Sequence, residues 1–168
     1  MPKRRVWEDY PFYIPLLREI LNLSIIGVGV LILVRLGSGF VLFYLLYVLF
    51  VIFLLTKLRC TRCYHHGRLC STGFGKLAGL LYPKDTKHCF VEGLVYNLFL
   101  FLIPLIPLVA IIFLLVEDFT CLELGYLLVL LFLMAATVVE HLMLGCQHCH
   151  ELEGCLTRWF FLRRRDCA

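Results

Sequence analysis

The chain has 168 residues, of which 61% are hydrophobic, and a formal net charge of +4. Soluble domains contain roughly 45–50% apolar residues, and a chain of this size cannot bury so large an excess in one core. Composition therefore excludes an ordinary soluble domain. Basic residues in such a chain are typical of the cytoplasmic side of a membrane protein, so we expect a lipid bilayer and no nucleic acid as its partner.

Four continuous apolar segments follow one another along the chain. Each is close to the roughly 17–25 residues that a helix needs to cross a hydrocarbon core about 30 Å thick. None alternates between apolar and polar residues as a barrel strand would. We therefore predict an all-α integral membrane protein with four transmembrane helices. The expected helices cover residues 15–34, 40–56, 94–116 and 124–144.

These helices form two tandem helical hairpins, because short connections at 35–39 and 117–123 join their members. The resulting parts are a cytoplasmic amino-terminal segment (1–14), a first transmembrane hairpin (15–56), a basic Cys/His-rich loop (57–93), a second transmembrane hairpin (94–144) and a Cys/His-rich tail (145–168).

Lysine and arginine gather in the two terminal segments and in the long loop, with Arg35 the main exception. The positive-inside rule then places both termini and the long loop in the cytoplasm. We expect a multi-pass protein of the cell (inner) membrane.

Four ionisable residues fall near the cytoplasmic ends of the expected helices. Arg18 and Glu19 in the first helix are expected to snorkel towards the interface or to pair with each other. Glu140 and His141 near the end of the fourth helix are interpreted as interfacial residues, because they lie within one or two turns of the membrane surface.

A similar cysteine motif follows each hairpin, which indicates an internal repeat. Both motifs are C-x-x-C with a third cysteine six or seven residues later. The first contains Cys60, Cys63 and Cys70, and the second contains Cys146, Cys149 and Cys155. A parallel repeat would bring the two motifs together beneath the bundle. The alternative is two independent clusters with coincidental spacing.

Paired thiols on a cytoplasmic face indicate metal binding, because persistent disulfides are rare in that reducing compartment. Two C-x-x-C turns can supply the four thiolates of a tetrahedral zinc site. Cys60, Cys63, Cys146 and Cys149 form the expected quartet. Alternatively, each motif holds its own ion with local ligands. The additional candidate ligands are Cys70, Cys89, Cys155, His66, His148 and His150.

A zinc site that joins the long loop to the tail of a membrane-anchored chain is typical of a structural or adaptor protein. We therefore expect a component of a membrane assembly that acts with a soluble protein partner or as a homo-oligomer. No constellation of catalytic residues indicates an enzyme. One alternative is a redox subunit with an iron–sulfur cluster held by the same thiolates. Another is a thiol–disulfide oxidoreductase, which the inward orientation of the motifs disfavours.

Overall fold

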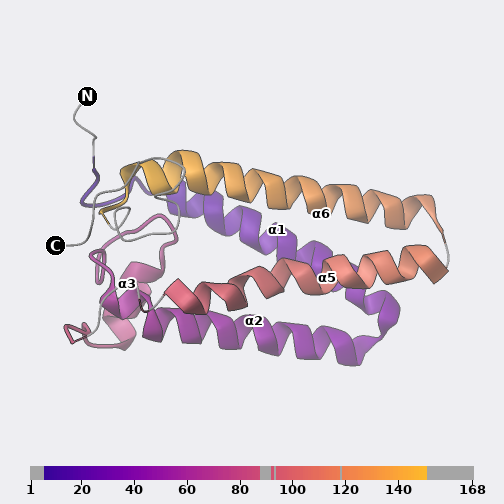
Figure 1. The fold of residues 1–168 in the computed structure, drawn as a ribbon, viewed down its shortest axis with the longest axis horizontal. Coiled ribbons are helices and arrows are strands. Elements are labelled where there is room, and N and C mark those ends of the chain that lie inside the picture. Colours follow the sequence, from indigo (N-terminus) through magenta and orange to yellow (C-terminus); the bar gives the residue numbers. More distant parts are fainter. Residues whose placement is uncertain (1–5, 88–91, 93, 118, 151–168) are drawn as a thin grey trace.

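The computed structural model describes residues 6–87, 92, 94–117 and 119–150, and the regular structure of these residues is entirely helical (Figure 1). Four of the helices are long and apolar enough to cross a membrane, as the sequence predicts. The α-helices are α1 (Tyr13–Leu36), α2 (Ser38–Leu58), α3 (Phe74–Leu81), α5 (Asn97–Glu117) and α6 (Cys121–Glu140).

The four long helices lie side by side as an elongated bundle (Figure 1). Helix α1 contacts the other three, and α5 contacts both α2 and α6. Helix α3 and both C-x-x-C motifs lie at the end of the bundle where α1 begins, which we call the motif end. The opposite end holds Gly37 and Thr120, and we call it the turn end.

The two connections at the turn end are shorter than the sequence predicts, and each has a local cause. Gly37 alone separates α1 from α2 and has φ of 134°, a conformation that side chains with a Cβ rarely adopt. The Thr120 hydroxyl caps α6 by accepting a hydrogen bond from the Glu123 backbone N–H at 3.3 Å. Thr-x-x-Glu is the capping-box pattern, so α6 begins at Cys121, three residues before the expected start.

The centre of the bundle depends on a close approach at Gly29. A Cβ at this position would lie 3.0 Å from the Tyr44 hydroxyl oxygen and 3.2 Å from Pro107 Cγ. Small residues allow membrane helices to pack this closely. Tyr44 and Pro107 are both fully buried here, so Gly29 joins α1 to α2 and α5.

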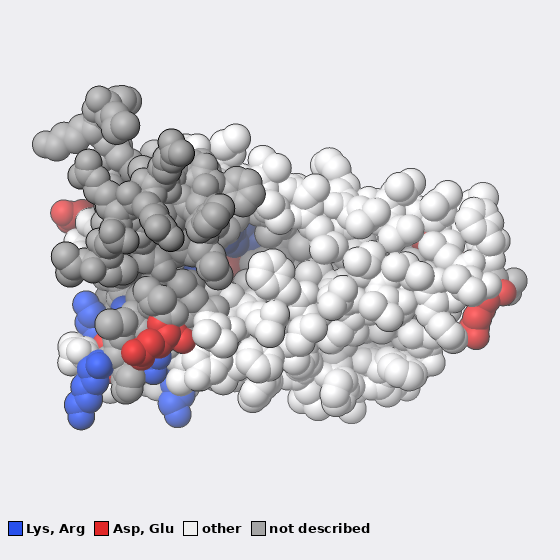
Figure 2. Space-filling model, in the orientation of Figure 1, with Lys and Arg blue, Asp and Glu red and all other residues white. Residues whose placement is uncertain are grey.

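The outward faces of the bundle remain strongly apolar. Phe43 is 72% exposed and Phe132 is 71% exposed. Figure 2 shows charged side chains gathered at the two ends of the molecule, with an almost uncharged band between them. Such a band matches the hydrocarbon core of a bilayer, in which ionisable side chains are costly.

Candidate functional site

The two C-x-x-C motifs adopt the same backbone conformation. Cys60–Arg62 and Cys146–His148 each form one turn of 3₁₀-helix. The Cys63 N–H donates to the Cys60 carbonyl at 3.4 Å, and the Cys149 N–H donates to the Cys146 carbonyl at 3.3 Å. Both Cys63 and Cys149 are extended, with ψ of 149° and 136°. The predicted repeat of the motif therefore has a counterpart in local structure.

The rings that directly follow the two motifs stack on each other. Tyr64 follows Cys63 and His150 follows Cys149, so these two rings occupy equivalent positions in the motifs. Their centroids lie 3.9 Å apart with an interplanar angle of 22°. The stack joins segments that are 86 residues apart in the sequence. The motif end is consequently one module built from both halves of the chain.

The segment before α1 also contacts both motifs. The Trp7 ring stacks on His148 at 3.8 Å, and the Trp7 backbone N–H donates to the His148 carbonyl at 3.2 Å. His65 Nε2 lies 3.2 Å from the Trp7 carbonyl oxygen. Because a carbonyl can only accept, His65 Nε2 carries the hydrogen. Residues 7–10 are expected from the sequence only to be part of the cytoplasmic segment, although a tryptophan and a tyrosine at these positions are a signal of packing.

The Cys70 thiol makes two polar contacts beside the first turn of α3. Its Sγ accepts a hydrogen bond from the Gly75 N–H at 3.2 Å and lies 3.2 Å from the Thr72 hydroxyl. A Cβ at Gly75 would lie 2.4 Å from the His65 carbonyl oxygen, so only glycine fits this approach. Burial, with a smaller contribution from the nearby Cys70, raises the pKa of the Cys60 thiol to about 12.

His66 is oriented in a way that suits a metal ligand. Its Nε2 donates to the Tyr82 carbonyl oxygen at 3.0 Å, which leaves Nδ1 as the ring nitrogen that could face a metal ion. Metal-binding histidines usually donate their other ring nitrogen to such a carbonyl or to a carboxylate.

The structure brings the motifs together without assembling a ligand set. Within residues 6–87, 92, 94–117 and 119–150, no three His, Cys, Asp or Glu side chains are gathered closely enough to hold a metal ion. Two candidate ligands, Cys89 and Cys155, lie outside the described residues. The zinc site therefore stays a prediction.

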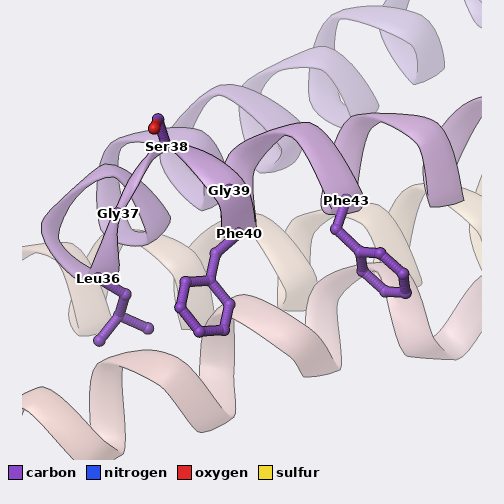
Figure 3. A pocket seen from close by; sticks show the side chains of 6 residues that line it. All are labelled: Leu36, Gly37, Ser38, Gly39, Phe40 and Phe43. Carbon is purple, nitrogen blue, oxygen red and sulfur yellow. The ribbon is translucent and has the colours of Figure 1, made fainter.

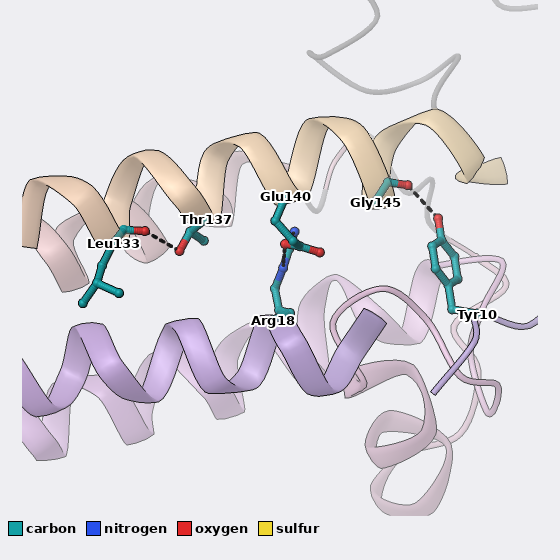
Figure 4. Close-up of polar contacts among 6 residues, drawn as sticks. All are labelled: Tyr10, Arg18, Leu133, Thr137, Glu140 and Gly145. Atoms are coloured by element: carbon teal, nitrogen blue, oxygen red, sulfur yellow. Dashed lines mark hydrogen bonds and ion pairs between the residues drawn. The ribbon is translucent and has the colours of Figure 1, made fainter. Parts of the chain in front are cut away.

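A buried ion pair joins α1 to α6 just inside the motif end (Figure 4). Arg18 Nε donates to Glu140 Oε2 at 2.6 Å, and Arg18 Nη2 contacts the same oxygen. The two side chains are only 7% and 5% exposed. The expectation that Arg18 snorkels or pairs with Glu19 is thus wrong, because a carboxylate from another helix at the same depth meets the guanidinium. The sequence does contain a signal for this pair, because opposite charges lie at the same expected depth in the first and fourth helices.

Directly after Glu140, α6 changes to a π-helical turn, His141–Gly145. Its Gly145 carbonyl accepts a hydrogen bond from the Tyr10 hydroxyl at 2.7 Å (Figure 4). A Cβ at Gly145 would lie 3.1 Å from His141 Nδ1. Single π turns are rare and often occur at functional sites. This turn lies between Glu140 of the ion pair and Cys146 of the second motif.

The turn end offers a less specific feature. Leu36, Phe40 and Phe43 line an open recess there, and the two rings point to the same side of α2 (Figure 3). Its lining contains no charged residue and only one hydroxyl, that of Ser38. An acyl chain suits this recess better than a polar ligand. The motif end is therefore the stronger candidate site.

Comparison with known protein families, with curated proteins and with solved structures finds no match to this chain. The function of the protein must therefore be inferred from its own residues.

Proposed function

We propose that this chain is an integral membrane protein of two tandem helical hairpins whose motif end lies on the cytoplasmic side of the inner membrane and binds zinc. Cys60, Cys63, Cys146 and Cys149 are the proposed ligands. The bound ion joins the long loop to the tail, and the resulting module acts as a structural or adaptor component of a membrane assembly.

One observation carries this proposal. The two C-x-x-C turns share a backbone conformation, and their equivalent following rings stack at 3.9 Å. In a 3₁₀ turn, residues i and i+3 lie on one side, so each motif offers two thiols in one direction. The described side chains of the two pairs do not gather around one point, so the pairs must move to share one ion.

The metal is identified by elemental analysis and an ultraviolet–visible spectrum of the full chain purified without chelator. We expect about one zinc ion per chain, as a shared tetrahedral site requires, and no visible absorption band. Iron with acid-labile sulfide would instead indicate the redox subunit. A metal-free protein would contradict the proposal and favour thiol–disulfide exchange.

The orientation has its own test, because Cys121 is an exposed cysteine at the opposite end from the motifs. An impermeant maleimide added to intact cells is expected to label the wild-type chain and to leave Cys121→Ser unlabelled. After permeabilisation and removal of metal, Cys121→Ser should label as well. Labelling of Cys121→Ser in intact cells would place the motifs outside, where disulfide chemistry is the expected use of paired thiols.

A further inference from the structure

Helix α3 has one packed face and one open face. Gly75 and Ala78 are buried on the packed side, where the Gly67 N–H donates to the Gly75 carbonyl at 2.8 Å. A Cβ at Gly79 would lie 2.5 Å from Gly67 Cα, so backbone meets backbone along this face. The fold of the first motif thus fixes which side of α3 remains open.

The open face is a ridge of leucines. Leu77, Leu80 and Leu81 are 37%, 78% and 49% exposed. Residues three and four apart share one face of a helix, so these side chains form a continuous apolar strip. Exposed leucine on the membrane-spanning helices meets lipid, but α3 is a short helix outside the bundle. Its ridge needs a separate explanation.

The contacts of α3 place this helix beside the end of α2, where the expected membrane span ends. The helix contacts the end of α2 and the Cys60–Arg62 turn. Helix α2 carries its basic residue, Lys57, in its last turn, and lysine marks the boundary between the apolar core and the headgroups. Interfacial helices bury their apolar faces at this boundary, about 5–10 Å into it.

Exposed lysines lie on α3 and on the segments next to it. Lys57, Lys76, Lys84 and Lys87 are exposed. The nearby acids Asp85 and Glu92 are both engaged by Arg62, at 3.1 Å and 3.7 Å. Figure 2 shows blue side chains projecting from this end of the molecule. The surface therefore combines an apolar strip with excess positive charge.

We propose that α3 and its flanking lysines form a docking surface for anionic phospholipid headgroups, with the leucine ridge inserted at the headgroup boundary. The combination of an amphipathic helix and lysines is what anionic membranes attract. The surface would hold the first cysteine motif against the membrane. This inference requires insertion of the bundle but does not depend on the metal.

The test is photocrosslinking of the full chain in vesicles, with p-benzoylphenylalanine placed singly at Leu80, Phe132 or Glu8. Leu80 and Glu8 are exposed at the motif end, and Phe132 is exposed on α6 within the apolar band. Vesicles contain phosphatidylcholine alone or mixed with phosphatidylglycerol. Adducts are identified by mass spectrometry.

We expect phospholipid adducts at Leu80 and Phe132 but not at Glu8. At Leu80 the adduct should favour phosphatidylglycerol over its share of the lipid. Lys76→Gln and Lys84→Gln should each lower that preference about fivefold at low salt, with no change at Phe132.

Lipid adducts at Phe132 without any at Leu80 would overturn the inference while leaving the membrane bundle intact. A crosslink from Leu80 to another protein chain, or an adduct at Leu80 indifferent to phosphatidylglycerol, would also overturn it. Absence of adducts at both Leu80 and Phe132 would overturn it together with membrane insertion.

Discussion

Replacing Arg18 by leucine is expected to destabilise the folded bundle by about 3–5 kcal/mol, the usual cost of removing one partner of a buried ion pair. Glu140 would lose its partner in a site where its side chain is only 5% exposed. Glu140→Leu should cost a similar amount, because it leaves the Arg18 guanidinium uncompensated. Unfolding in detergent micelles, followed by circular dichroism, measures both changes.

The double variant Arg18→Leu with Glu140→Leu distinguishes the net contribution of the ion pair from the cost of leaving one charge without its partner. Two leucines remove both charges, so its stability should return close to that of the wild type. Glu8→Gln is the matched control, because its pair with Arg68 is long, at 3.8 Å, and exposed. That control should cost about 0–1 kcal/mol. A double variant as unstable as either single variant would contradict this account, because it would show that the pair itself stabilises the bundle and that an uncompensated charge is not the cause of the loss.

The four long apolar helices could be predicted because their signal lies within single segments of the chain. An apolar stretch of the right length leaves the backbone no alternative to helix in lipid. The predicted ends of these helices were less accurate, because a helix end depends on local backbone and side-chain interactions that hydropathy does not describe. Gly37 reverses the chain through a positive φ, and Thr120 starts α6 through its side chain.

The Arg18–Glu140 pair could not be predicted with the same ease. Its members are 122 residues apart, and their contact depends on how α1 and α6 are rotated about their axes. Hydropathy gives the depth of a residue but not its rotation. The π turn at His141–Gly145 likewise depends on tertiary contacts, including the hydrogen bond from Tyr10.

The candidate site was predicted only in part, for a related reason. Spacing identified the two motifs, and their equal turns match that expectation. The contribution of Trp7 and Tyr10 was missed, because stacking on His148 and bonding to Gly145 require the fold to bring residues 7–10 between the motifs. Aromatic residues in a charged segment suggest that the segment packs against the fold, but the residues that it contacts become known only from the structure.

Removing either cysteine motif is expected to abolish metal binding altogether. The two turns are held against each other by the Tyr64–His150 stack, and a tetrahedral zinc site needs thiolates from both. Two thiolates alone leave half of the coordination sphere to water and bind far more weakly. Two independent sites would behave differently, since loss of one motif would leave the other ion in place.

The decisive measurement is the zinc-to-protein ratio of three purified variants, each checked for helical content by circular dichroism. Cys60→Ser with Cys63→Ser should hold no zinc, and neither should Cys146→Ser with Cys149→Ser. Cys121→Ser, at the far end of the bundle, should keep the wild-type ratio. An ion retained by either motif in the absence of the other would contradict a site shared between the two halves of the chain.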